Sequence, residues 1–294
     1  MPAFSKTRIA PTPSGFLHLG NAFSFILTAA MARLHGASIL LRVDDLDKER
    51  CRQAYLDDLF DTLLFLDIPW DEGPRSPKDV YDRFSQHLRL DQYETVLSQL
   101  HQAGFLFPCA CSRSDLANAG LNSGCTGKCL EKTAQAAAWK IADSPETIEI
   151  LSYPSRFSTY PFPTAMKHLV VKKKDGFPSY HLASVVDDVF FGVDLIVRGA
   201  DLWESSLAQL HLSSLLPTTR AFAHATFLHH PLLTEDGQKL SKSAGHNPIR
   251  QLRQTALHRK EIYQQASRFF GLEAEATNLR EFTDLLDPTR FASL

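Results

Sequence analysis

Apolar residues form strand-like and helix-like patterns in turn along the first forty-five residues. The run 7–10 predicts a short strand, and the Pro- and Gly-containing segment 11–15 ends it. Residues 21–34 are apolar on most faces, as in a buried helix, and Gly36 stands where such a helix ends. The continuous apolar run 38–43 is typical of a strand covered on both faces. This order predicts an α/β fold that opens a doubly wound, nucleotide-binding parallel sheet.

The remainder of the chain continues this alternation. Apolar residues at three- and four-residue spacing predict helices over 55–66, 81–104 and 204–216, and the chain after 245 is mostly helical in pattern. Apolar runs predict strands at 168–171 and 193–197. We therefore expect a sheet-bearing catalytic domain in two halves, an inserted subdomain between them and a short helical region last. These segments are 1–104, 105–166, 167–245 and 246–294.

Composition places the chain among ordinary globular proteins. Its 294 residues suggest about two domains, or one domain with an insertion. Hydrophobic residues make up 44% and charged residues 22%, which excludes collagenous, low-complexity and disordered chains. A net charge of −2 excludes a globally basic nucleic-acid coat but not a local basic face. No membrane span or secretory signal is apparent, so we expect a cytoplasmic protein without a membrane partner.

Four of the five cysteines are crowded within 21 residues, in the pattern C-x1-C-x13-C-x3-C. Cys109, Cys111, Cys125 and Cys129 can surround one tetrahedral Zn²⁺ with four thiolates. A closed set of four protein ligands predicts one structural zinc per chain. The alternative is four free thiols in a reducing cell, and Cys51 is expected to be an ordinary helix residue.

Two separated motifs carry the candidate chemistry. In RIAPTPSGFLHLGN, His18, Gly20 and Asn21 stand at the start of a helix that follows a strand, where free backbone N–H groups attract phosphate. The lysines and hydroxyls of KLSKS, residues 239–243, can neutralise a polyphosphate. The GxGxxG and Walker A patterns are absent, which disfavours dinucleotide binding and P-loop chemistry.

Together these motifs resemble the HIGH and KMSKS signatures of class I aminoacyl-tRNA synthetases, in the same order. LLRVDDLDKER, WDEGP, PSYHLASVVDD and GVDLIVRGADL further resemble the glutamyl-tRNA synthetase subgroup, and the resemblance runs from about Arg8 to Ser243. It implies a Rossmann-like doubly wound catalytic domain with an inserted zinc-binding subdomain. It also implies that glutamate reacts with ATP, which carries Mg²⁺, to give glutamyl-adenylate and pyrophosphate before the glutamyl group passes to tRNA.

The resemblance assigns an amino-acid pocket. Arg8 and Arg198 match the cations that bind the substrate carboxylates, a task suited to guanidinium forks. Ala10 and Thr12 match residues that line the same pocket, and Tyr180 matches the tyrosine that closes it.

Asp44 is a departure within this pocket. The family has Glu at this position, where it anchors the substrate amino group, and Asp is one methylene shorter. The shorter side chain withdraws the carboxylate by about one C–C bond length, enough to break a direct hydrogen bond unless water intervenes. We still expect glutamate as substrate, because both arginines are present.

The resemblance also assigns the ATP site. His18, Gly20 and Asn21 fall on ATP-phosphate positions, and Lys242 is the motif lysine nearest the transferring phosphate. We expect His18, Asn21, Lys239 and Lys242 to be the catalytic residues, acting through positioning and charge stabilisation.

Only 51 residues follow Ser243, fewer than an anticodon-binding region requires. With the cysteine cluster and the IVRGADL segment, this resembles the glutamyl-queuosine tRNA(Asp) synthetases, paralogues that attach glutamate to the queuosine base in the anticodon loop. The expected partners are glutamate, ATP and queuosine-containing tRNA(Asp), bound by a monomer. Residues 239–268 hold seven Lys and Arg against one Glu, which predicts a tRNA-binding face.

Three alternatives remain open. The chain could be a truncated glutamyl-tRNA synthetase that charges the 3′ end of an ordinary tRNA. It could be a non-catalytic, synthetase-like module that binds tRNA or an amino acid, although intact His18, Lys239 and Lys242 argue against this. A nucleotidyltransferase that makes a small cofactor is disfavoured by the length of the glutamyl-type resemblance.

Overall fold

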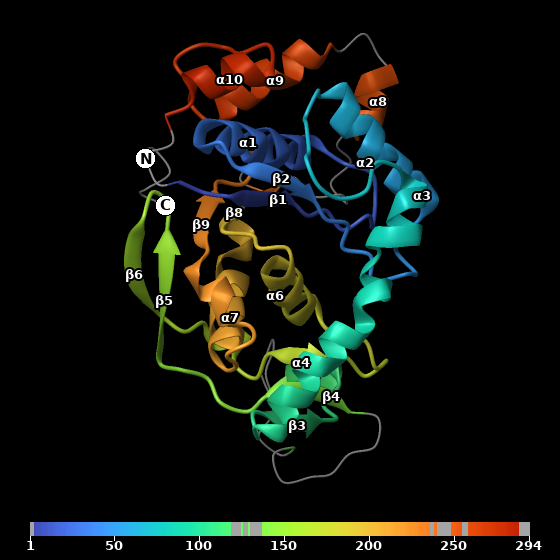
Figure 1. Cartoon of the computed structure of the whole chain (residues 1–294), viewed down its shortest axis with the longest axis vertical. Coiled ribbons are helices and arrows are strands. Elements are labelled where there is room, and N and C mark those ends of the chain that lie inside the picture. Colours follow the sequence, from blue (N-terminus) through green and yellow to red (C-terminus); the bar gives the residue numbers. More distant parts are fainter. Residues whose placement is uncertain are drawn as a thin grey trace.

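The computed structural model describes residues 3–118, 125, 129, 137–235, 238–239, 248–254 and 258–287. Its centre is a six-stranded sheet of order β2-β1-β8-β9-β5-β6 (Figure 1). The strands are β1 (Lys6–Ile9), β2 (Ser38–Leu41), β5 (Thr147–Ser152), β6 (Arg156–Pro161), β8 (Leu195–Gly199) and β9 (Thr226–His230). Strands β2, β1, β8, β9 and β5 pair in parallel in that spatial order, whereas the edge strand β6 is antiparallel to β5. The predicted α/β fold with a parallel sheet is confirmed.

Helices cover both faces of this sheet. Figure 1 shows α1 (Leu19–His35), α9 (Arg259–Phe269) and α10 (Leu279–Leu285) on one side, and α6 (Tyr180–Phe190) and α7 (Trp203–Ser214) on the other. Because side chains alternate across a strand, neighbours on β2 enter different cores. Leu41 packs in the core with α1, while Leu40 packs in the core with α6. The continuous apolar runs in the sequence therefore reflect burial on two faces.

The first predicted elements agree with the structure. Helix α1 ends at Gly36, whose φ of 67° is the left-handed conformation that glycine adopts most easily. The helix predicted over 81–104 is instead interrupted at Ser85, which has extended backbone and accepts a hydrogen bond from the His87 N–H. This local side-chain hydrogen bond competes with a continuous helix.

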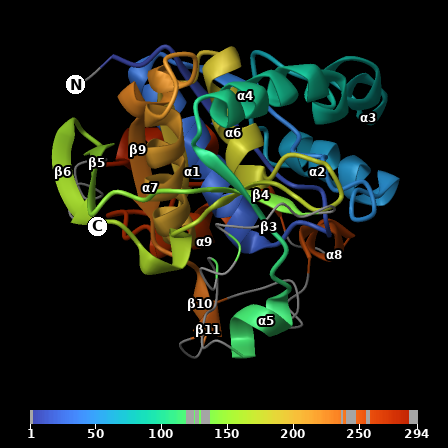
Figure 2. The ribbon, with the colours of Figure 1, turned by 90° about the horizontal axis from the view of Figure 1, so that it is seen from below.

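Elements on either side of that interruption are α2 (Gln53–Phe65), α3 (Pro77–Asp79), the π-helix η1 (Val80–Phe84), the 3₁₀-helix η2 (Gln86–Arg89) and α4 (Leu90–Gln102). Further 3₁₀-helices are η3 (Thr164–Met166), η4 (Ala200–Leu202) and η5 (Arg220–His224). Short elements are α5 (Arg113–Asn118), β10 (Thr234–Glu235), β11 (Gln238–Lys239) and α8 (Ile249–Gln254). Seen from below, α5 and the β10–β11 pair extend on one side of the molecule (Figure 2).

A second, antiparallel sheet is formed by β3 (Leu106–Cys109), β4 (Ala138–Ile141) and β7 (Val170–Lys172). It carries Cys109 at the end of its first strand. The insertion predicted over 105–166 does not coincide with this sheet. Strands β5 and β6 lie inside that range but pair in the large sheet, whereas β7 lies outside it and pairs with β4. Among the described helices, none combines the length and apolar character that a membrane crossing requires.

Candidate active site

A cavity of about 330 Å³ opens where β1, β8 and β9 end and α1 begins. The carboxyl ends of parallel strands are the usual ligand-binding edge of such sheets. Eight of the site residues predicted from the sequence line this cavity. They are Arg8, Ala10, Thr12, His18, Gly20, Asn21, Tyr180 and Arg198. Residues of the 8–21 segment, Tyr180 and Arg198, far apart in the chain, are thus brought together.

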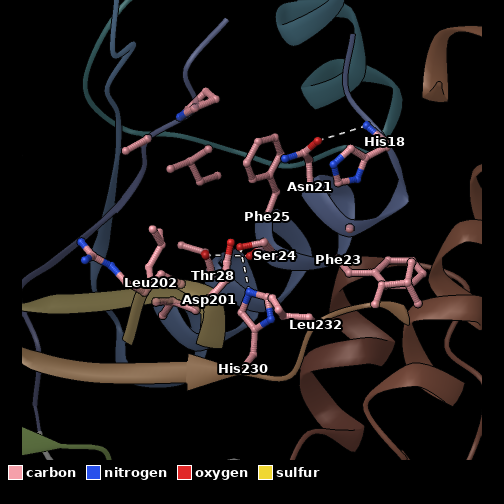
Figure 3. A pocket seen from close by; sticks show the side chains of 18 of the residues that line it. His18, Asn21, Phe23, Ser24, Phe25, Thr28, Asp201, Leu202, His230 and Leu232 are labelled. Atoms are coloured by element: carbon pink, nitrogen blue, oxygen red, sulfur yellow. Dashed lines mark hydrogen bonds between the residues drawn. The ribbon is translucent and has the colours of Figure 1, made fainter. Parts of the chain in front are cut away.

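The start of α1 forms one end of the cavity (Figure 3). His18 is the residue at which the helix begins, and its backbone N–H donates to Asn21 Oδ1 at 3.1 Å. The imidazole of His18 lies close to Gly20. A Cβ at residue 20 would be only 3.0 Å from His18 Cε1. The glycine therefore lets the histidine lie across the first helical turn, where backbone N–H groups favour an anion.

The two arginines of the predicted amino-acid pocket have different surroundings. Arg8, on β1, pairs with buried Asp188 at 3.3 Å and donates through Nη1 to the Val197 carbonyl at 3.2 Å. Arg198, on β8, is also buried, but it forms no ion pair with any carboxylate of the described residues. Arg8 is thus ion-paired inside the protein, whereas Arg198 has no ion pair among the described residues, although Asp188 lies near enough to raise its pKa.

Arg198 uses only part of its hydrogen-bonding capacity. Nη1 donates to Gln209 Oε1 at 2.7 Å and to Ser206 Oγ at 3.2 Å. Its Nε and Nη2 atoms are buried and have no hydrogen-bond partner among the described residues. Burial lowers the pKa of Arg198 to about 10, so the side chain keeps its charge at neutral pH. A buried cation with two unused donors is costly unless a ligand satisfies it.

Asp44 does not line the cavity with these arginines. Its carboxylate is held by Arg42, with Nε 2.7 Å from Oδ1 and Nη2 3.0 Å from Oδ2. Arg42 also donates to Asp188 Oδ1 at 2.6 Å. The shorter side chain thus belongs to an internal ion-pair network, and the structure does not place it with the other residues predicted to bind the substrate.

Sequence reasoning missed several polar residues of the cavity, among them Asp201 and His230 (Figure 3). His230 Nδ1 lies 2.8 Å from the Pro231 carbonyl and must donate to it, so Nε2 accepts from Ser24 Oγ at 3.0 Å. Both residues lie at or just beyond the carboxyl end of a parallel strand, which is the signal that could have identified them.

The lysines of the second motif are only partly described. Lys239 lies in β11, of which the structure describes the backbone, and Lys242 lies outside the described residues. Leu232 and Leu233, just before this hairpin, line the cavity. In the predicted basic tail, Arg259 pairs with Asp67 at 3.4 Å and Arg268 with Glu275.

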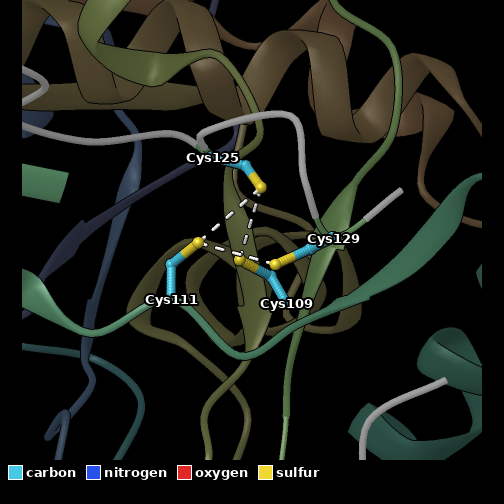
Figure 4. Close-up of side chains that lie close together, drawn as sticks. All are labelled: Cys109, Cys111, Cys125 and Cys129. Atoms are coloured by element: carbon cyan, nitrogen blue, oxygen red, sulfur yellow. Dashed lines mark hydrogen bonds between the residues drawn. The ribbon is translucent and has the colours of Figure 1, made fainter. Parts of the chain in front are cut away.

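The four predicted metal-binding cysteines lie together (Figure 4). Their sulfur atoms are within 4.8 Å of one another. Cys111 Sγ is 3.9 Å from Cys125 Sγ and 3.5 Å from Cys129 Sγ, and Cys109 Sγ is 3.6 Å from Cys125 Sγ. Tetrahedral Zn²⁺ with Zn–S bonds of about 2.3 Å separates its sulfur ligands by roughly 3.8 Å. The donor set and its spacing therefore fit zinc.

Comparison with known families agrees with the geometry of the cavity. The model for the catalytic domain of class I tRNA synthetases (E and Q) matches residues 5–138 and 151–291. The chain belongs to this family. It is accordingly a ligase-type enzyme, and the resemblance inferred from the two motifs is confirmed.

Individual members of this synthetase family are similar to the chain over most of its length. The chain is 33% identical to glutamyl-Q tRNA(Asp) synthetase of Methylococcus capsulatus, over 83% of this chain and 78% of that protein. It is 30% identical to glutamate–tRNA ligase 2 of Syntrophus aciditrophicus, over 86% of this chain but 54% of that protein. The structure of glutamate-tRNA synthetase from Elizabethkingia anophelis matches with a TM-score of 0.78 at 17% identity, covering 98% of this chain and 66% of that one. This last likeness concerns the fold.

Proposed function

We propose that this synthetase activates glutamate with ATP and transfers the glutamyl group to the queuosine base in the anticodon loop of tRNA(Asp). The observation that carries the first step is Arg198, a buried cation in the cavity lining with two donors unused among the described residues. A carboxylate can accept both donors in the bidentate geometry that suits guanidinium.

The amino acid would lie between Arg198 and the start of α1. Its α-carboxylate must reach the phosphates, which bind near His18 and Asn21 in this proposal. Arg198 therefore holds the side-chain carboxylate. Tyr180 is 39% exposed although it lines the cavity, so its ring is placed to cover a bound substrate.

ATP would bind with its phosphates at the N-terminus of α1. The glutamate α-carboxylate attacks the α-phosphorus, the bond to the bridging oxygen breaks, and pyrophosphate leaves with the electron pair. His18 and the helix N–H groups stabilise the charge, and Lys242 is proposed for the same task from the sequence. Asp201 can accept hydrogen bonds from ribose hydroxyls.

The acceptor is proposed from the relatives. Five curated relatives, 33–35% identical to the chain, are named glutamyl-Q tRNA(Asp) synthetase, while three glutamate–tRNA ligases match at 30–31%. The adenylate would then be attacked by a hydroxyl of the modified base, releasing AMP. Transfer to the 3′ end of an ordinary tRNA is the second candidate.

The test is glutamate-dependent ATP–pyrophosphate exchange, with aspartate and glutamine as controls, followed by transfer to tRNA with and without queuosine. We expect exchange with glutamate and transfer that requires queuosine. Equal transfer to tRNA lacking queuosine would favour the second candidate. Absence of exchange under all conditions, with and without tRNA, would contradict the proposed activation step.

The cysteine cluster would hold one structural Zn²⁺ through Cys109, Cys111, Cys125 and Cys129. Bound zinc would join the strand that ends at Cys109 to the segment containing Cys125 and Cys129, and so supply local folding energy. Elemental analysis of the purified protein should give about one zinc per chain. A Cys111→Ser variant should lose it, and a Cys51→Ser variant should keep it. Wild-type protein without metal would contradict the site.

A further inference from the structure

The segment just before α1 is held by two elements that are distant from it in sequence. The Leu17 backbone N–H donates to Asp58 Oδ2 at 2.9 Å, and the Leu17 carbonyl accepts from the Ile249 N–H at 2.8 Å. Asp58 belongs to α2 and Ile249 begins α8. Both backbone polar groups of the residue that precedes His18 are therefore taken up by these two helices.

Asp58 also joins the two helices to each other. Its Oδ1 accepts from Arg253 Nη2 of α8 at 3.0 Å, while Arg253 Nη1 donates to Thr62 Oγ1 at 2.9 Å. The Asp58 carboxylate is buried, and burial raises its pKa, an effect opposed by the Leu17 hydrogen bond and by Arg253. One buried carboxylate thus bridges the phosphate-site segment and α8.

Phe16, the residue before Leu17, also contacts both α2 and α8, through its aromatic ring. The Phe16 ring meets Tyr55 of α2 edge-on, with centroids 5.0 Å apart. On α8, the Arg250 guanidinium carbon lies 5.1 Å from the centre of the Phe16 ring. Residues 16 and 17 are therefore fixed against both helices through side-chain and backbone groups.

The contacts of Leu17 connect two segments to which the proposed function assigns ATP binding or that lie beside such a segment in the chain. His18 directly follows Leu17, and α8 begins six residues after Ser243, the last residue of the lysine motif. We infer that Asp58 is a positioning residue for ATP, one that fixes the His18 segment relative to α8. This inference rests on the proposed function. The carboxylate does not line the cavity, so it acts through Leu17 and Arg253.

Asp58→Asn tests this role, because the amide oxygen can still accept from Leu17 while the charge that pairs with Arg253 is lost. Arg253→Met removes the same ion pair from the other side. The matched control is Asp61→Asn, since Asp61 also contacts Arg253, at 3.4 Å, but is exposed. We expect both test variants to raise the KM for ATP about tenfold, the effect of one lost charge-assisted hydrogen bond, with the KM for glutamate unchanged.

The double variant should be no worse than Arg253→Met alone, because Arg253→Met already removes the ion pair with Asp58. A purely structural role would lower the unfolding temperature and leave the KM for ATP unchanged, and that result would overturn the inference. Calorimetric ATP binding without glutamate provides a second measurement. Wild-type protein that binds ATP but shows no glutamate-dependent exchange would contradict the proposed function, while weaker ATP binding by Asp58→Asn would still support the positioning role. Unchanged binding would overturn that role.

Discussion

Two groups of buried arginines differ in their partners, and each has a member that lines the cavity, Arg8 in one and Arg198 in the other. Arg8, Arg42 and Arg89 all pair with carboxylates, chiefly Asp187 and Asp188 at the end of α6. Arg198, on the strand next to that of Arg8, donates hydrogen bonds only to neutral groups among the described residues, Ser206 and Gln209. Burial alone therefore does not decide whether an arginine is paired inside the protein. Arg198 lines the cavity and has no ion-paired carboxylate among the described residues, which is why we propose it as a partner of the substrate carboxylate.

The largest expected effect follows replacement of Arg198. Arg198→Met removes the proposed bidentate partner of the substrate carboxylate. Two charge-assisted hydrogen bonds at about 1.5–3 kcal/mol each correspond to a loss of roughly 100-fold or more in kcat/KM for glutamate. The unfolding temperature should change little, because the variant also removes an uncompensated buried charge. Glutamate-dependent pyrophosphate exchange and a thermal melt measure the two quantities. Arg198→Lys should remain impaired, since a point charge does not replace the guanidinium fork.

For the arginines that pair with carboxylates, we expect the main effect to be on stability and not on activity. Asp188→Ala leaves Arg8 and Arg42 without a shared carboxylate, so we expect the free energy of unfolding to fall by about 3–5 kcal/mol. Urea denaturation measures this loss. A variant as stable as the wild type would show that the network is not structural, and the contrast with Arg198 would then fail.

The smallest expected effect concerns pH. Burial, followed by repulsion from Arg198, lowers the pKa of His229 to about 3. The unfolded chain binds a proton near pH 6.5 that the native state binds only near pH 3. The stabilisation is therefore complete above pH 6.5 and is lost as the pH falls, by about 2 kcal/mol at pH 5.

Urea denaturation at pH 7 and pH 5 measures the His229 contribution, with His229→Gln as the variant that lacks it. An identical loss in wild type and His229→Gln would exclude this histidine as the cause.

The sequence predicted the elements whose pattern is local. The strand, helix and second strand at the start of the chain follow from apolar runs and from Gly36, and the motif over residues 8–21, which contributes to the cavity lining, is contiguous in sequence. The four cysteines were predicted as a cluster because their spacing is short. In each case the signal lies within about twenty residues.

What the sequence did not reveal depends on contacts between distant segments. Strands β5 and β6 join the large sheet through a parallel neighbour, β9, more than seventy residues away, which local periodicity cannot show. Asp44 is held by Arg42 beside Asp187 and Asp188 of α6, and this network removes it from the cavity. Asp201 and His230 line the same cavity because strands β8 and β9 are neighbours in the sheet and end side by side.

The most direct test of the account is the binding of glutamate and of glutamine, its uncharged isostere, measured by calorimetry with wild type and Arg198→Met. We predict that wild type binds glutamate at least about 100-fold more tightly than glutamine, because only the carboxylate satisfies both unused donors. Arg198→Met should abolish this preference. Equal binding of the two amino acids by wild type, or an unchanged preference in the variant, would contradict the assignment of Arg198 as the substrate-carboxylate site.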